Sequence, residues 1–257
     1  MCYNILWKYF SRYFMKNYKI VVSYDGSKYN GWQKQGNTSN TMQERFENVL
    51  SRMCAHPVEI HASGRTDAGV HAIAQTANFK CETSLSPCEI KAYLNKYLPE
   101  DILVKSCEIA DDRFHARLNA VSKTYEYLIA VDKPDVFVRK YVWVSENKPD
   151  IEIMRHAAEK LLGTHDFKGF STGKTKKSTV RTINWIDISE NDGIIAIRIN
   201  GSGFLYNMVR IISGTLYDIG IGKLEETVID KVFETKIREN AGQTLPPQGL
   251  KLVEAFY

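Results

Sequence analysis

The strongest constraint on the fold is an order of strand and helix patterns that occurs twice along the chain. In the first half, a β-branched strand at 19–26 precedes an amphipathic helix whose apolar residues recur from Met42 to Met53. Strands at 58–63 and 71–80, a helix at 87–97 and a strand at 101–109 complete this half. The order β-α-β-β-α-β is that of a ferredoxin-like unit.

The second half repeats the order with additional elements. The expected strands are 123–131, 136–144, 179–189, 193–201 and 250–257, and the expected helices are 151–163, 203–217 and 224–235. The predicted fold class is therefore α+β, with two ferredoxin-like halves built on antiparallel sheets. We place the N-terminal half at 15–112 and the C-terminal half at 113–257.

The first fourteen residues do not continue either pattern. The segment 1–14 is aromatic and basic, and it lacks the apolar core and small-residue cleavage site of a signal peptide. We expect Met15 to be the natural start and 1–14 to be a non-core extension. No apolar run approaches the ~20 residues of a membrane span, which predicts a cytoplasmic protein without membrane contact.

Cysteine and histidine spacing gives no metal or disulfide pattern. The five cysteines form no C-x-x-C, and their odd, scattered set argues against a disulfide framework or a cysteine-based zinc site. The histidines form no H-E-x-x-H, so we expect no metal. The formal net charge of +4 agrees with a nucleic-acid partner and does not establish one.

Two charged positions have both a structural and a functional interpretation. Asp67 lies in the glycine-flanked loop Gly64–Gly69, GRTDAG, which is either a loop with a local ion pair or a site approached closely by backbone. Arg210 lies opposite the apolar face of the helix expected from residue 203. It is either solvated or turned into a cleft, where Asp67 is a candidate partner. Tyr125 lies on an expected strand in which aromatic and polar residues alternate, and this pattern is typical of aromatic residues in a core.

Two further segments were considered. Residues 220–223, GIGK, lack the spacing and the hydroxyl residue of a phosphate loop, so no nucleotide cofactor is expected. Segment 168–181 is rich in turn residues and carries several lysines, among them Lys174, Lys176 and Lys177. We expect it to form a loop whose lysines contribute to the affinity for a nucleic-acid partner.

The loop does not stand alone in the sequence. Gly64–Ala72, GRTDAGVHA, resembles the catalytic loop of the tRNA pseudouridine synthase A family. Other segments resemble that family in the same order along the chain, covering 24–35, 94–102, 114–129, 179–183, 203–216 and 246–252. The resemblance extends over essentially everything from Met15 to Tyr257.

The resemblance implies an isomerase that converts uridine in RNA to pseudouridine, without a cofactor. It implies that Asp67 is the catalytic nucleophile, since a carboxylate can trap or stabilise a sugar that becomes positive as its glycosidic bond breaks. A covalent and a glycal route both remain open. It further implies that Tyr125 stacks on the target uracil, that Arg210 pairs with Asp67, and that Arg65 helps extrude the target nucleotide.

The resemblance also implies an architecture and a partner. The two sheets run together around a central basic cleft, the assembly is a homodimer, and the substrate is tRNA, with positions 38–40 of the anticodon stem-loop as the target. The alternatives are the same isomerisation on another RNA such as ribosomal RNA, a non-catalytic RNA-binding module, or a small-molecule enzyme. An intact set of Asp67, Tyr125 and Arg210 argues against a binding module, because a carboxylate near phosphates does not help binding.

Overall fold

The structure is a computed structural model that describes residues 15–173 and 176–257. The extension expected at 1–14 and the predicted RNA-binding Lys174 lie outside the described residues. Within those two ranges, no helix has the length and apolar character that a membrane crossing requires.

The N-terminal half has the predicted ferredoxin-like order. Its elements are β1 (Lys16–Tyr24), α1 (Met42–Cys54), β2 (Ile60–Ala62), β3 (His71–Cys81), α2 (Pro87–Tyr97) and β4 (Ile102–Ala110). In the sheet these strands lie in the order β2-β3-β1-β4, and every pair is antiparallel.

The C-terminal half repeats this arrangement with insertions. Its ferredoxin-like elements are β5 (Ser122–Val131), α3 (Ile151–Glu159), β8 (Val180–Asn191), β9 (Ile194–Gly201), α4 (Met208–Gly220) and β10 (Leu250–Phe256). The insertions are β6 (Trp143–Ser145), β7 (Gly163–Asp166) and α5 (Thr227–Thr235). The strand order β10-β5-β9-β8 matches that of the first half, so the α+β prediction is confirmed.

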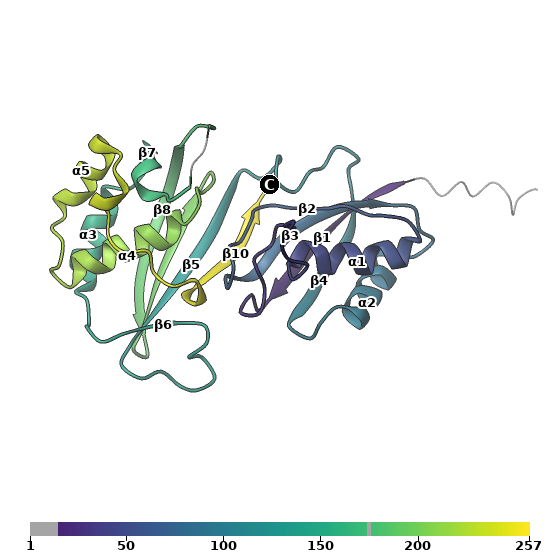
Figure 1. The fold of residues 1–257 in the computed structure, drawn as a ribbon, viewed down its shortest axis with the longest axis horizontal. Coiled ribbons are helices and arrows are strands. Elements are labelled where there is room, and N and C mark those ends of the chain that lie inside the picture. The colour runs from purple at the N-terminus through teal and green to yellow at the C-terminus, as the bar shows by residue number, and fades with distance from the viewer. Residues whose placement is uncertain (1–14, 174–175) are drawn as a thin grey trace, which may run out of the picture.

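The two sheets join at one edge of β3. Strand β2 pairs with the C-terminal part of β3, and β10 pairs in parallel with its first two residues, His71 and Ala72. Since β1 occupies the other edge, β2 and β10 share this one. The loop between β2 and β3 therefore emerges at the seam. In Figure 1, helices α1 and α2 lie at one end of the molecule and α3, α4 and α5 lie at the other. Strands β5 and β10 run between these two groups of helices.

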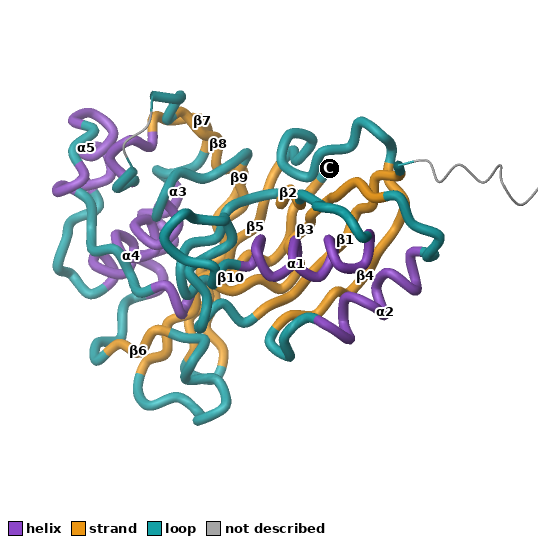
Figure 2. Tube along the Cα trace, turned by 45° about the vertical axis from the view of Figure 1, so that its right-hand side comes forward, coloured by secondary structure: helices purple, strands orange, loops and turns teal. Residues whose placement is uncertain are grey.

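Local signals explain why the helices form where they do. The Thr41 hydroxyl accepts a hydrogen bond from the amide of Glu44, which caps α1, and Phe46 of this helix is fully buried. A capping box formed by Ser86 and Glu89 begins α2. Figure 2 shows the strands as a continuous layer with α1 and α2 packed over the N-terminal part.

Two segments differ from the sequence prediction. The strand expected at 136–144 is present only as Trp143–Ser145, because the backbone before it forms turns around the carbonyl and side chain of Asp135. The helix expected from residue 203 begins at Met208, after Asn207 in a left-handed conformation with φ 61°. Residues 203–207 are consequently a loop.

The expectation that the cysteines form no disulfide is wrong for one pair. Cys54 ends α1, Cys81 ends β3, and a disulfide joins them across a Cα–Cα distance of 6.4 Å. They are 27 residues apart in the sequence. Their proximity results from α1 packing beside the β2–β3 hairpin, which residue spacing alone does not show.

Candidate active site

The loop between β2 and β3 is fixed by backbone hydrogen bonds to the segment that follows β1. The amide of Trp32 donates to the carbonyl of Thr66 at 3.0 Å, and the amide of Gly69 donates to Tyr29 at 3.3 Å. The Thr66 hydroxyl lies 2.7 Å from the phenol of Tyr24, with both groups buried. The loop is thereby held on both sides of Asp67.

Two glycines permit this close approach. Gly31 has φ +86°, and a Cβ there would lie 2.6 Å from the carbonyl oxygen of Thr66. Gly69 has φ +79°, and a Cβ there would meet the ring of Pro247 at 3.0 Å. L-residues with side chains rarely adopt these φ values, so the sequence requires glycine at both positions.

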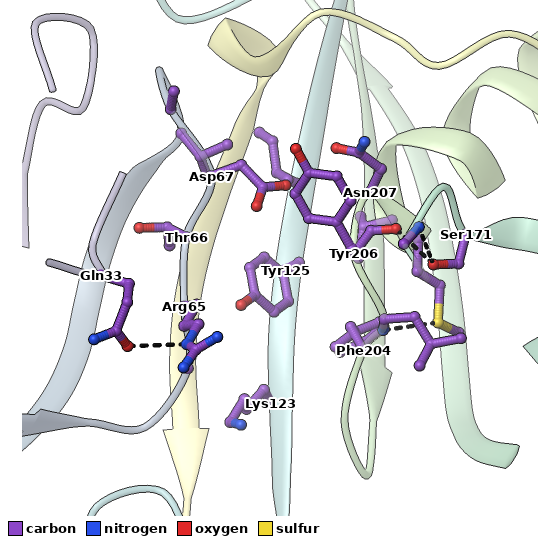
Figure 3. A pocket seen from close by; sticks show the side chains of 18 of the residues that line it. Gln33, Arg65, Thr66, Asp67, Lys123, Tyr125, Ser171, Phe204, Tyr206 and Asn207 are labelled. Carbon is purple, nitrogen blue, oxygen red and sulfur yellow. Dashed lines mark hydrogen bonds between the residues drawn. The ribbon is translucent and has the colours of Figure 1, made fainter. Parts of the chain in front are cut away.

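The fixed loop presents Asp67 to a cavity of about 780 Å³. In Figure 3 its carboxylate points into this space, toward Tyr206. Burial raises the pKa of Asp67 above its ordinary value, and the positive charge of Arg210 opposes part of that rise. The group is a half-buried acid that favours its neutral form more than a solvated aspartate does.

Tyr125 lies on the floor of the same cavity. The sheet register aligns it in one row with Leu252 of β10 and Ala72 of β3, so two strand spacings separate it from the start of the loop strand. The ring is 7% exposed and meets Phe204 edge to face, with ring centroids 5.1 Å apart. Burial raises the pKa of the Tyr125 phenol far above its usual range, so it is neutral at physiological pH.

Arg210 does not form the direct pair with Asp67 that the resemblance implied, and the role of Arg65 in extruding the nucleotide stays a prediction. Among the described residues neither forms an ion pair with Asp67. Arg65 is exposed, lines the cavity and donates from Nε to the amide oxygen of Gln33 at 2.9 Å (Figure 3). Arg210 donates from Nε to the carbonyl of Leu245 at 2.6 Å and from Nη1 to Asn207 at 2.8 Å. It acts on Asp67 through its field rather than through direct contact.

Sequence reasoning did not identify two of the cations in this cavity, Arg117 and Lys123. Five lysine and arginine residues line it with Asp67, the one acidic residue of the described lining: Arg65, Arg117, Lys123, Lys177 and Arg181. Burial and the charges of Arg117 and Arg181 lower the pKa of Lys123 to about 8. A position on the strand predicted at 123–131, two residues before Tyr125, was the only sequence signal for Lys123, and it does not distinguish a cleft position from a core position.

The loop before α4 supplies further lining. Phe204 packs beside Tyr125, and Tyr206 is 57% exposed on the opposite side of the cavity from the Asp67 loop. The sequence predicted a helix from residue 203, and that prediction did not indicate that these two aromatic residues line a cavity. Among the described residues, the cavity contains no cluster of metal-binding side chains.

A carboxylate, a stacking aromatic ring and a surplus of cations in one cleft define an enzyme that acts on a polyanion such as a nucleic acid. Comparison with known proteins gives the class. The family model described as tRNA pseudouridine synthase matches residues 20–119 and 157–257. The chain belongs to the tRNA pseudouridine synthase family.

Curated relatives match over nearly the whole chain. The "tRNA pseudouridine synthase A" of Bacillus sp. (strain KSM-64) is 48% identical over 89% of this chain and 94% of that relative. The protein of the same name from Acetivibrio thermocellus is 42% identical over 95% of this chain and 100% of its own length. A solved structure of a Cbf5–Nop10–Gar1 complex is similar to 91% of this chain and 48% of the matched chain, at 13% identity and a TM-score of 0.39.

Proposed function

We propose that this protein converts uridine to pseudouridine in tRNA, at positions 38–40 of the anticodon stem-loop, with Asp67 as the catalytic residue. The family assignment supports the reaction and the tRNA substrate. The observation that carries the site assignment is the half-buried Asp67 in a cavity lined by five cations. A carboxylate repels phosphates, so a surface that only bound RNA would be better without it.

The reaction rearranges bonds within one nucleotide. The N1–C1′ bond breaks and its electron pair leaves with the uracil, so the sugar becomes electron-poor. Asp67 acts on that sugar as an anion, either by bonding to C1′ or by assisting removal of the C2′ proton. The base then turns and C5 bonds to C1′, while the Asp67–C1′ bond breaks in the covalent route or a proton returns to C2′ in the glycal route. The C5 proton is then released, and N1 takes up a proton. The product is an isomer of the substrate.

Tyr125 holds the detached base in this scheme. An aromatic face attracts a base without fixing its rotation about the stacking axis, and such a contact contributes roughly 1–3 kcal/mol. Because the phenol is neutral, it can donate a hydrogen bond. It does not act as a proton acceptor, because the phenolate that would accept the proton is unfavourable at neutral pH. Its role is therefore stacking, with the hydroxyl as a hydrogen-bonding group.

The cations handle the RNA backbone. The target nucleotide must leave its stack, which costs a few kcal/mol, and contacts to the extruded backbone offset part of that cost. Arg65 is exposed at the cavity edge and lies on the loop that carries Asp67. We assign it to stabilise the extruded state, and we assign Lys123 and Arg117 to nearby phosphates.

We further propose that the enzyme is cytoplasmic, where tRNA is processed, and homodimeric. Two groups of exposed apolar side chains are available for a contact between subunits: Leu118 with Val121, and Val136 with Phe137. Light scattering of the purified chain tests the dimer. A monomeric mass at micromolar concentration would contradict it.

Pseudouridine mapping of total RNA from a strain lacking this protein, beside its parent, tests the function. We expect loss of pseudouridine at tRNA positions 38–40 and its return with the wild-type gene. Loss in ribosomal RNA instead would favour the alternative substrate. In vitro, RNA carrying tritium at uridine C5 should release tritium, because C5 exchanges its hydrogen for the sugar. Salt-dependent binding without release would favour a non-catalytic RNA-binding module.

A further inference from the structure

Three metal-binding atoms meet at the opposite end of β3 from the active-site loop. The two sulfurs of the Cys54–Cys81 disulfide and an imidazole nitrogen of His56 all lie within 4.8 Å of one another. Cys54 is the last residue of α1, and Cys81 is the last residue of β3. With a strand rise of about 3.4 Å per residue, β3 places this cluster roughly 30 Å from Asp67.

The chain turns sharply to bring His56 to this point. Ala55 follows α1 with φ 56°, in the left-handed region that residues other than glycine adopt rarely. This conformation ends the helix and directs the chain back toward β3, where Ile60 of β2 pairs with Phe79. The strained backbone therefore coincides with the convergence of the two cysteines and the histidine.

The ring of His56 has the arrangement of a metal-binding histidine. Its Nδ1 lies 3.0 Å from the carbonyl oxygen of Pro57, and because a carbonyl only accepts, Nδ1 carries the proton. In the neutral ring Nε2 then has a free lone pair. That Nε2 is shielded from solvent and has no hydrogen-bond partner. Metal-binding histidines commonly donate their second ring nitrogen to a backbone carbonyl in this way.

We propose that Cys54, His56 and Cys81 form a binding site for Zn²⁺ when the two cysteines are reduced. Two thiolates and one imidazole match the soft and borderline donors that zinc prefers, and the fourth tetrahedral position remains for water. The disulfide in the structure is the oxidised, metal-free form of the same site.

The two forms are linked by a balanced exchange. A dithiol reductant transfers two electrons to the disulfide, becomes a disulfide itself and leaves two thiols. Zn²⁺ then displaces one proton from each thiol and accepts the His56 lone pair. Oxidation reverses the sequence and releases the metal. The site is independent of the proposed RNA chemistry, because it shares no residue with the active-site cavity.

Metal analysis of the full chain tests the proposal. Protein reduced anaerobically with a phosphine and desalted should bind about one Zn²⁺ per chain, whereas protein with its disulfide intact should bind none. Co²⁺ in place of Zn²⁺ should give a tetrahedral visible spectrum with a thiolate charge-transfer band. Reduced protein that binds no metal, or a cobalt spectrum without the thiolate band, would overturn the proposal.

Variants separate the site from other thiols. Cys54→Ser, Cys81→Ser and His56→Ala should each weaken Zn²⁺ binding by at least about tenfold, since each removes a ligand. The double variant Cys88→Ser/Cys107→Ser removes the free cysteines of residues 15–173 and 176–257 and should bind as wild type does. His56→Ala leaves both buried cysteines in place, so its folding is least affected. Equal Zn²⁺ affinity in His56→Ala and wild type would contradict the three-ligand site.

Discussion

The two walls of the active-site cavity are built differently. The loop wall, residues 64–70, is a short segment fixed by backbone hydrogen bonds to residues 29 and 32, and it carries the acid. The strand wall, formed by residue 117, β5 and residues 204–209, carries the aromatic rings, Arg117 and Lys123. The difference suggests that bond breaking and bond making depend on Asp67 of the loop wall, whereas base stacking and, apart from the contact of Arg65, RNA handling depend on the strand wall. Each prediction below tests this division.

Asp67→Asn should have the largest effect. Removing the anion without changing the shape of the side chain should lower tritium release by about 10⁴-fold, the scale seen when a catalytic carboxylate is lost. RNA affinity should stay within about twofold, or rise slightly, because a charge that repels phosphate is gone. Asp112→Asn, on the exposed surface, is the matched control. Substantial turnover by Asp67→Asn would end the assignment of the loop wall to chemistry.

Arg210→Lys comes next, with an expected loss of roughly 10²-fold in turnover. Lysine retains the charge, but it cannot bind both Leu245 and Asn207 as the planar guanidinium does. In Arg210→Gln the loss of the positive charge should raise the pKa of Asp67 further. Since the reaction requires the carboxylate, the acid limb of the pH–rate profile should move to higher pH. An unmoved limb would show that Arg210 does not act on Asp67.

Tyr125→Ala should lower turnover by about 10- to 100-fold, the cost of losing one base stack. Tyr125→Phe keeps the stacking face and should cost far less. Equal losses in the two variants would assign the main role to the hydroxyl. Tyr97→Ala, an exposed tyrosine distant from the cavity lining, controls for loss of an aromatic ring.

Charge removal on the strand wall should change affinity alone. Lys123→Gln combined with Arg117→Gln should weaken RNA binding and reduce the slope of log affinity against log salt by about 0.7–0.9 per cation. Turnover at saturating RNA should be unchanged. Lys133→Gln, exposed and outside the cavity lining, should leave the slope unaltered. A fall in saturated turnover would show that the strand wall takes part in chemistry.

The smallest effect is a pH dependence of RNA affinity. With a pKa of about 8, Lys123 is charged below that pH and loses its proton above it, so affinity should decline as pH rises through 8. The decrease in RNA affinity should be no larger than the decrease caused by removing the charge of Lys123 altogether. Lys123→Arg stays charged, and its affinity should be flat over the same range. Parallel profiles for the two proteins would rule out titration of Lys123.

Local signals predicted the fold well where they were strong. The helix predicted with Pro87 near its first turn and its end at Tyr97 is confirmed as α2, because a proline is favoured in the first turn of a helix. The strand predicted at 136–142 does not form. The segment is rich in β-branched residues, but hydrogen bonds to Asp135 hold its backbone in turns. The boundary of the halves at residues 112 and 113 stays a prediction.

The site was predictable only in part. Asp67 and Tyr125 were identified through resemblance to a family, because the residues alone left a local ion pair open for Asp67 and favoured a core position for Tyr125. Lys123 lines the cavity because of the register of β5 in the sheet. Cys54 lies beside Cys81 because of tertiary packing. Neither relation has a short-range sequence signal. The expected contact between Arg210 and Asp67 does not form, because Leu245 and Asn207 bind the guanidinium.

The position of β10 has a consequence for how the enzyme matures on the ribosome. This strand comes last along the chain, yet it lies in the middle of the sheet, between β3 and β5. Before residues 250–256 emerge, both halves can fold, but each exposes an unpaired strand edge of the kind that promotes aggregation. The active site cannot assemble until β10 has been synthesised. Premature termination shortly before Leu250 should therefore yield inactive, aggregation-prone chains rather than partially active ones.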